Sequence, residues 1–325
     1  MLALTTAGER VIVDSAVPRF QALLQSAAPG ELVTPPAASP EPTVCLTVQD
    51  GPAFDATGWT LVSRGVWARA GRALLEDACS SGFDLLVDPR ADVLHVTARY
   101  RPAPRTRLAN TVLATRFRLL AAQTLLHYPV LWWASLRGRA PLHVSVSSGT
   151  DGVAMLAGPS GVGKSTLVAA GIARGDVVTA DNVCACDARS AYGLVEPLRV
   201  EGGAAGPRAP HGRREYPLPG RAPRLEPDLL VVVRRAERGQ RASVRPVSAD
   251  DAVRELVAGT YAAGELRRFW GFAAMLALAT GLGPAHPPVT EVATALAVRL
   301  PRLEMRLAHG SRAPLCELLG SEVDA

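Results

Sequence analysis

The stretch that most restricts how this chain can fold is residues 158–165, GPSGVGKS, which match the pattern of a phosphate-binding P-loop in full. An apolar run at 153–156 precedes it, and residues 165–174 have the pattern of a helix. The glycines allow a tight turn in which successive N–H groups face phosphate oxygens, and the helix adds the partial positive charge of its N-terminus. The pattern therefore predicts a strand, loop and helix that bind a nucleoside triphosphate.

Lys164 is the only lysine of the 325 residues, and every other Lys or Arg position is an arginine. An ammonium is a compact charge on a flexible stem that reaches phosphate oxygens inside a narrow loop, whereas a guanidinium is a wider planar fork. The Ser165 hydroxyl is expected to ligate Mg²⁺ beside the phosphates. We therefore expect ATP to be bound by Gly158, Pro159, Ser160, Gly161, Val162, Gly163, Lys164, Ser165 and Thr166.

The composition is that of a folded protein with a sizeable core, since 48% of the residues are hydrophobic and 20% are charged. The net charge of +5 suits an acidic ligand, but aromatic residues are few and no basic run is interleaved with them, so no nucleic acid partner is expected. The most apolar later stretch, 269–283, is shorter than the roughly 20 residues of a membrane span and predicts a buried core helix. The N-terminus lacks the apolar run of a signal peptide, so we expect a soluble, cytoplasmic protein without a membrane partner.

The five cysteines are odd in number and sparse, which argues against a disulfide framework. Cys184 and Cys186 form a C-x-C pair with no second pair at zinc-finger spacing. We interpret them as two small apolar residues on a strand rather than as part of a metal site.

The pattern of the sequence changes at about residue 136. Short strands are expected over 43–100 and helices over 108–137, after a Pro-rich spacer at 28–42. From residue 141 on, strand, glycine turn, helix and strand follow one another in the order of a βαβ unit. The sequence therefore predicts an α/β protein, with a smaller α+β N-terminal domain at 1–135, a P-loop domain at 136–315 and a tail at 316–325.

Residues 201–227 are rich in Gly, Pro and Arg and separate this unit from the apolar strand at 228–233. A segment of this length inside a compact domain is either disordered or functional. Two interpretations stay open: a solvated loop, and a lid or acceptor groove in which the arginines of 208–224 meet an acidic partner.

Asp181 is the carboxylate best placed to act beside the P-loop. It ends the apolar run 177–180 and follows Lys164 by only 17 residues, so a short crossover helix would return it to the loop. At that place it can hold Mg²⁺ or accept a proton from an attacking hydroxyl. The strand at 228–233 carries its acid at the opposite end and is followed by two arginines, so it is not expected to supply this group.

His143 lies 21 residues before Lys164, at the start of the strand that precedes the P-loop. Its imidazole is expected to orient or tune Asp181. A histidine in an apolar strand is, taken alone, more often structural, and that alternative stays open.

These residues together resemble the C-terminal domain of HPr kinase/phosphorylase. The resemblance is carried by Leu-His143-Val, by the P-loop, and by residues 174–183, RGDVVTADNV. It covers about residues 136–310 and is specific over 143–183. The nearer relatives are bacterial HPr-kinase-like serine kinases, some of them in gene clusters for peptide natural products, including lasso peptides. The N-terminal half does not match the N-terminal domain of HPr kinase/phosphorylase.

The resemblance implies the P-loop fold that this family shares with phosphoenolpyruvate carboxykinase. It implies that Asp181 is the base that activates a serine hydroxyl, with His143 nearby, and that Lys164 contacts the phosphates. Ser165 and Asp181 would be the Mg²⁺ ligands. The family also assembles as oligomers, which makes a homo-oligomer an expectation for this chain.

The sequence departs from the family at identifiable positions. Asn182 stands where the family has a second adjacent acid, which leaves open the second metal contact and the reverse, phosphorolytic reaction. Thr166 stands where HPr kinase/phosphorylase has a glutamate. The family's later signature of Arg and Glu is not recognisable; Glu196 and Arg199 are its nearest candidates, and we interpret both as surface residues.

The sequence thus predicts a kinase that uses ATP and Mg²⁺ and transfers the γ-phosphate to a hydroxyl. The preferred acceptor is a serine of a peptide or small protein, such as the precursor of a ribosomal peptide natural product. Two alternatives stay open: a kinase of a small-molecule hydroxyl, and a regulatory ATP-binding protein that transfers no phosphate. A motor or GTPase is disfavoured, because no N-K-x-D base-recognition motif is present.

Overall fold

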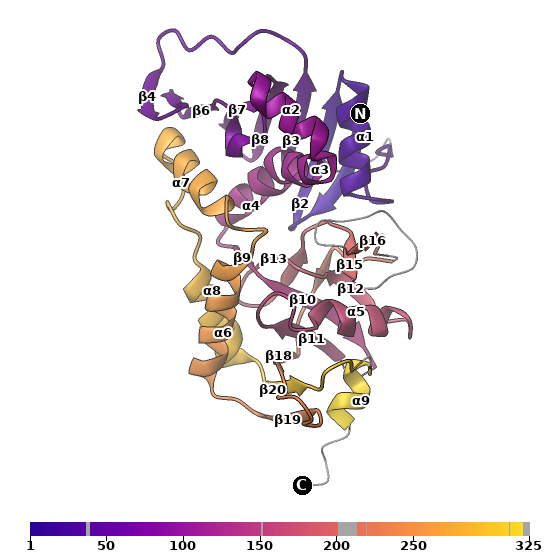
Figure 1. The fold of residues 1–325 in the computed structure, drawn as a ribbon. Helices are drawn as coiled ribbons and strands as arrows, with labels where there is room; N and C mark the ends of the chain where they lie inside the picture. The colour runs from indigo at the N-terminus through magenta and orange to yellow at the C-terminus, as the bar shows by residue number, and fades with distance from the viewer. Residues whose placement is uncertain (37–39, 151, 201–212, 219, 312, 321–325) are drawn as a thin grey trace. The chain divides into compact units, whose positions relative to one another are not determined.

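The computed structural model describes residues 1–36, 40–150, 152–200, 213–218, 220–311 and 313–320. It has a mixed α/β architecture with several sheets and two compact units (Figure 1). Among the described residues, the first unit comprises 1–137 and 268–287, and the second comprises 138–200, 213–267 and 288–320. The change of unit after Arg137 falls beside the boundary expected from the sequence.

The first unit is built on an eight-stranded mixed sheet. The side chains of its longer strands alternate between buried and partly exposed, as in Leu2–Thr6 and Val44–Gln49, so one face packs against the helices. The central neighbours β2, β3 and β8 run parallel, and all other neighbours are antiparallel. The order is β1 (Leu2–Thr6), β2 (Glu9–Ser15), β3 (Val44–Gln49), β8 (Val93–Tyr100), β7 (Phe83–Arg90), β6 (Arg72–Leu75), β5 (Val66–Arg69) and β4 (Thr60–Ser63).

Helix α7 (Phe269–Thr280) is the apolar helix expected within the P-loop domain, but it belongs to the first unit. There Tyr128 packs with its ring centroid 5.8 Å from those of Phe269 and Phe272. An apolar helix is buried by whichever sheet it meets, and the sequence pattern does not specify which one. The other helices of this unit are α1 (Pro18–Ala27), α2 (Pro104–Val112), α3 (Ala114–Ala122) and α4 (Tyr128–Ser135), with a short 3₁₀ helix at Ala78–Ser80 and a π-helical turn at Gln123–His127.

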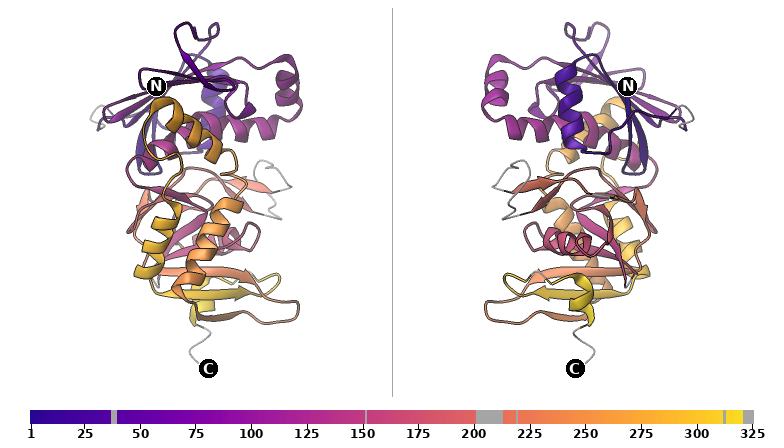
Figure 2. Two further views of the ribbon diagram at one scale, coloured as in Figure 1. Left: turned by 90° about the vertical axis from the view of Figure 1, so that its left-hand side faces the viewer. Right: turned by 90° about the vertical axis from the view of Figure 1, so that its right-hand side faces the viewer.

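The second unit is built on a six-stranded sheet that carries the P-loop. Figures 1 and 2 show α5 on one face of this sheet and α6 and α8 on the other. The strand order is β12 (Val177–Ala180), β10 (Val144–Gly149), β11 (Gly152–Ala157), β18 (Leu229–Arg235), β20 (Arg302–Leu307) and β19 (Ser243–Pro246). The helices are α5 (Lys164–Ile172), α6 (Ala249–Ala262), α8 (Val289–Arg299) and α9 (Leu315–Gly320). Helix α9 lies where the sequence suggested only a tail.

Smaller sheets complete the second unit. One joins β17 (Arg224–Leu225), β14 (Ala191–Gly193), β13 (Cys184–Cys186) and β9 (Ala140–Leu142), and the other pairs β15 (Leu198–Val200) with β16 (Arg214–Tyr216). The C-x-C pair is therefore a buried strand, as expected. Strands β16 and β17 fall in the segment expected to be one long loop, of which residues 201–212 and 219 lie outside the described residues.

The strand directions bring three chain segments to one edge of the large sheet. Strand β10 is antiparallel to both of its neighbours, with Val144 opposite Ala157 of β11 and Val146 opposite Ala180 of β12. The beginning of β10 and the carboxyl ends of β11 and β12 therefore lie at the same edge. His143, the P-loop and Asp181 leave the sheet there, which is the position that ligands take in open α/β sheets.

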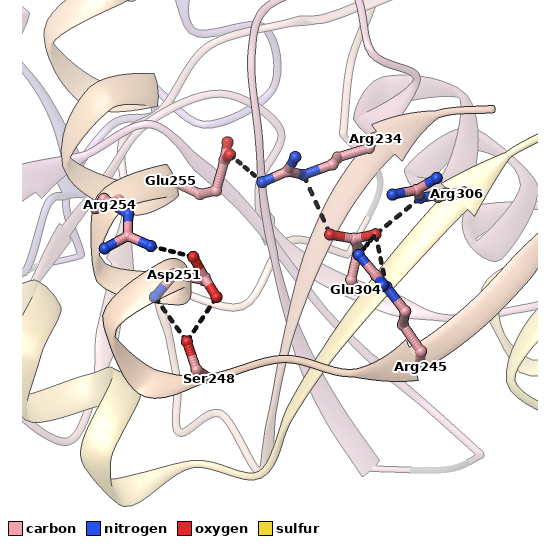
Figure 3. Close-up of polar contacts among 8 residues, drawn as sticks. All are labelled: Arg234, Arg245, Ser248, Asp251, Arg254, Glu255, Glu304 and Arg306. Atoms are coloured by element: carbon pink, nitrogen blue, oxygen red, sulfur yellow. Dashed lines mark hydrogen bonds and ion pairs between the residues drawn. The ribbon is translucent and has the colours of Figure 1, made fainter. Parts of the chain in front are cut away.

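A cluster of ionic contacts joins β18, β19, β20 and α6 (Figure 3). Glu304 is buried on β20, and its carboxylate contacts Arg245 at 2.9 Å, Arg306 at 2.8 Å and Arg234 at 3.3 Å. Arg234 also pairs with Glu255 of α6. Because a buried carboxylate is stable only when it is paired, these contacts are structural.

No helix among the described residues is both long and apolar enough to cross a membrane. The longest apolar helix, α7, has 12 residues, fewer than the roughly 20 that a span requires.

Candidate functional site: a phosphate pocket at the sheet edge

The P-loop connects β11 to α5 with a backbone that only glycine adopts without strain. Gly158 has φ +141° and Gly163 has φ +120°. A Cβ atom on Gly158 would lie 2.5 Å from the carbonyl oxygen of Val233 on the neighbouring strand. The glycines are therefore required both by their dihedral angles and by the close approach of β18.

Replacement of Gly158 by alanine is expected to lower the free energy of unfolding by about 3 kcal/mol, because the clash with Val233 adds to the backbone strain. Gly161→Ala is the matched control. Gly161 has φ +80°, but a Cβ there would meet nothing within 4 Å, so a loss of about 1 kcal/mol is expected. Urea denaturation of the two variants tests the difference, and equal losses would contradict the described loop geometry.

Lys164 opens α5, and its side chain is directed into the loop. The residue is 5% exposed, and its Nζ donates hydrogen bonds to the carbonyl oxygens of Gly158 at 2.8 Å and Pro159 at 3.2 Å. Burial lowers the pKa of Lys164 to about 8, while the charges of Asp181 and Glu265 act in the opposite direction. The ammonium is thus held at the loop, where phosphate oxygens would replace the two carbonyl acceptors.

Asp181 follows β12 at the same edge and is completely buried. Within the described ranges, neither of its carboxylate oxygens has a hydrogen-bond partner of normal geometry. Burial raises the pKa of Asp181 to about 6, while the Ser165 hydroxyl and the charges of Lys164 and Arg199 act to lower it. A completely buried carboxylate whose pKa stays raised despite these partners is unfavourable for folding alone, and it fits a group that receives a cation or a proton.

The stability of the apoprotein should report this arrangement of Asp181. Burial raises the pKa of Asp181 in the folded protein to about 6, above the 3.8 of an ordinary aspartate, so it weakens folding progressively as pH rises through that interval. Asp181→Asn removes the ionisation and is expected to stabilise the apoprotein by about 3 kcal/mol at pH 8, and by little at pH 4. Denaturant unfolding at the two pH values tests this, and a variant less stable than the wild type at pH 8 would contradict it.

His143 lies at the break between β9 and β10, where the chain passes from one sheet to the other. It is 3% exposed, and its backbone N–H donates to the Thr260 hydroxyl at 3.0 Å. Burial and the nearby charge of Lys164 lower the pKa of His143 to about 4, so the imidazole is neutral at pH 7. Its Nδ1 has no hydrogen-bond partner in the described part of the chain. The imidazole is therefore placed at the pocket, and its orienting action on Asp181 stays a prediction.

The pocket around these groups is rich in cations and contains about 550 Å³ of open space, part of it continuous with solvent. The P-loop residues that line it include Ser160, Lys164, Ser165 and Thr166. Other parts of the second unit add His143, Asn182, Arg199, Arg213, Arg235 and Glu265. This excess of positive charge suits a ligand with several phosphate groups.

The interpretation of Arg199 and Glu196 as surface residues is wrong. Arg199, on β15, is 8% exposed and lines the pocket. Its guanidinium lies 3.2 Å from Glu196, 3.5 Å from Glu215 and 3.9 Å from Glu265. A surface assignment follows from average behaviour of charged residues, but mutual pairing allows these to be buried. The spacing Glu196-x-x-Arg199 soon after Asp181 was the signal available in the sequence.

Glu196 is a second buried acid at the site, which the sequence interpretation missed. It is 4% exposed, and burial raises the pKa of Glu196 to about 7, although Arg199 lowers it. A hydrogen bond from the Asn182 side chain also lowers this pKa. Its Oε1 has no hydrogen-bond partner among the residues that the structure describes. Asn182, which stands at the position of the second acid in the resembled motif, therefore lies beside another acid, Glu196.

Hard oxygen ligands for Mg²⁺ are present in the Ser165 hydroxyl and in the buried carboxylate of Asp181 beside it, so these residues fit the ion. Outside the masked positions, no group of three or more His, Cys, Asp and Glu side chains is arranged to hold a metal. A P-loop site does not require one, because phosphate oxygens and water complete the octahedron.

Comparison with known proteins yields no assignment: no family model matches the chain, and a search of curated proteins finds no match. The resemblance to HPr kinase/phosphorylase therefore rests on the motif residues 143–183. His143 and the P-loop line the pocket, and Asp181 lies buried at the same sheet edge.

Proposed function

We propose that this protein is an ATP- and Mg²⁺-dependent kinase whose second unit is a P-loop domain of the HPr kinase/phosphoenolpyruvate carboxykinase type. The group transferred is the γ-phosphate, and the preferred acceptor is the hydroxyl of a serine in a peptide or small protein. The observation that carries the proposal is the completely buried carboxylate of Asp181, which lies beside the Ser165 hydroxyl and at the same sheet edge as the P-loop lysine.

The P-loop would bind the donor through its backbone N–H groups and the ammonium of Lys164. Ser165 and Asp181 would hold Mg²⁺, which when bound neutralises negative charge on the phosphates. Arg199, on the pocket wall, adds a positive charge that is kept in place by its own carboxylate partners. These groups favour a ligand in which negative charge is concentrated at the loop.

Asp181 would accept the proton of the acceptor hydroxyl as the oxygen attacks the γ-phosphorus. A pKa of about 6 leaves the carboxylate ionised at pH 7 but keeps it basic enough to take a proton. The imidazole of His143 lines the P-loop pocket and is neutral, so it adds no positive charge there. The cation next to it is Lys164, whose charge helps to lower the pKa of His143.

A regulatory ATP-binding protein without phosphotransfer is the second candidate, and the observation that favours it is Asn182. An amide at this pocket position cannot serve as a second anionic metal ligand. The buried Glu196 beside it supplies another acid close to Asp181, and for this reason we favour the kinase.

The two candidates and the acceptor class are separated by one experiment. The protein is incubated with ATP and Mg²⁺ and, in parallel, with a degenerate peptide library containing one serine per peptide, the same library with alanine instead, and a mixture of small-molecule alcohols. Phosphopeptides formed only from the serine library would support the proposal. ADP formation with the alcohols alone would indicate a small-molecule kinase, and tight ATP binding without ADP in any reaction would favour the regulatory protein.

A further inference from the structure

Strand β18 ends in two consecutive arginines, Arg234 and Arg235, whose side chains contact different groups. Successive side chains of a strand point to opposite faces. Arg234 reaches Glu255 and Glu304 in the ionic cluster of Figure 3. Arg235 instead lines the phosphate pocket, with its Nη2 3.5 Å from the carbonyl oxygen of Gly161. The strand that lacks a terminal carboxylate thus supplies a guanidinium to the P-loop.

Arg235 differs from Lys164 and Arg199 in its pairing. Lys164 is hydrogen-bonded by the loop itself, and Arg199 has three carboxylates within 3.9 Å. In the part of the chain that the structure describes, Arg235 has no carboxylate partner, and its only hydrogen bond is the long contact to Gly161. The residue is exposed at the pocket, so its planar fork is available to an anion.

The sheet order places Arg235 on the opposite side of the P-loop from Asp181. Strand β11, which leads into the loop, has β18 on one side and β10, followed by β12, on the other. Asp181 leaves β12, so an acceptor whose proton goes to this carboxylate must approach from the β12 side. The phosphates that remain with the donor then extend away from Asp181, toward the end of β18.

We propose that Arg235 binds the phosphates of the leaving nucleoside diphosphate and stabilises the charge that they acquire. The inference rests on the proposed kinase function. In that reaction the bond between the γ-phosphorus and the bridging oxygen breaks, the acceptor oxygen forms the new bond, and its proton passes to Asp181. The bridging oxygen keeps the electron pair, so the additional negative charge appears on the diphosphate, within reach of Arg235.

Isothermal titration of ADP and of ATP, each with Mg²⁺, tests the inference on Arg235→Ala. Both nucleotides are expected to bind about tenfold more weakly, because the lost charge-assisted contact is to phosphates that both contain, and the loss for ADP should be at least as large as that for ATP. Arg235→Lys should recover part of the affinity, because the ammonium keeps the positive charge but lacks the planar guanidinium that binds two oxygens at once. Arg234→Ala is the matched control: it should unfold at lower denaturant concentration, because it leaves Glu304 with fewer partners, and bind both nucleotides normally.

Unchanged affinity for both nucleotides would overturn the inference. A loss confined to ATP would also overturn it, because Arg235 would then contact the terminal phosphate. Nucleotide binding does not require phosphotransfer, so these results are independent of whether the kinase proposal holds. Failure of that proposal is recognised separately, by wild-type protein that binds ATP and forms no product.

Discussion

Asp181→Asn is expected to lower the rate of phosphotransfer by about 10²–10⁴-fold, the range that a positioned general base contributes. The amide has nearly the same shape as the carboxylate but cannot accept the proton of the hydroxyl at neutral pH. Because the backbone of the P-loop and Lys164 are unaltered, binding of ADP should change far less than the rate. Single-turnover phosphotransfer and ADP titration on the same preparation measure the two quantities.

Asp228→Asn is the matched control for this prediction. Asp228 precedes β18 at the opposite edge of the same sheet, where its carboxylate accepts a hydrogen bond from the backbone N–H of Val153 at 3.1 Å. Asp228 is exposed and lies at the start of β18, whereas the P-loop lies at the other end of this strand. The variant should therefore retain full phosphotransfer. Near-normal phosphotransfer by Asp181→Asn, with ATP still bound, would remove Asp181 from the role of base.

The pH dependence of kcat/KM gives a further signature of the same group. The wild-type value should rise with pH through about 6, as Asp181 ionises in the free protein. It should fall again above about pH 8, as Lys164 loses the proton that gives it charge. The residual activity of Asp181→Asn should lack the acidic limb and keep the alkaline one.

Lys164→Ala is expected to weaken the binding of ATP by about 100-fold, because charge-assisted hydrogen bonds contribute about 1.5–3 kcal/mol each. The side chain is buried in the loop and already carries two hydrogen bonds, so it is positioned before the ligand arrives. Phosphotransfer should fall further than affinity, since the developing charge on the phosphates also loses its ammonium partner.

Lys164→Arg is the informative comparison, because it retains the charge and changes only its shape. A guanidinium is too wide for the space now occupied by Nζ between the loop carbonyls, so it should not restore ATP binding. Titration of ATP with both variants measures the effect. Binding by Lys164→Arg close to that of the wild type would contradict the explanation of why the chain keeps a single lysine.

The parts of the site that follow from the sequence are those set by local geometry. The P-loop is a continuous segment, so its glycines and its lysine predict the turn and the phosphate contact without any knowledge of tertiary packing. Asp181 was placed by the short distance along the chain from Lys164, and the structure brings it to the same sheet edge, as expected. What spacing did not reveal is that β10 lies between β11 and β12, with His143 at the junction of two sheets.

The parts that the sequence did not indicate depend on tertiary packing. Arg199 and Glu196 look like surface residues until β15 and its neighbours enclose them with complementary charges. Helix α7 is apolar enough for burial in either unit, and its packing against β4, β5, β6 and α4 assigns it to the first. In the sequence Arg235 is only a residue that follows an apolar run, because the direction and neighbours of its strand are needed to place it at the P-loop.

The central claim is that this site transfers the γ-phosphate of ATP with Lys164 and Asp181 as essential groups. The most direct test uses ATP labelled with ¹⁸O in the γ-phosphate, Mg²⁺ and the serine peptide library, followed by mass spectrometry of the peptides and of inorganic phosphate. We expect labelled phosphoserine from the wild type, and its loss in both Lys164→Ala and Asp181→Asn. Wild-type protein that binds ATP but places labelled phosphoryl groups neither on peptides nor on water would contradict it.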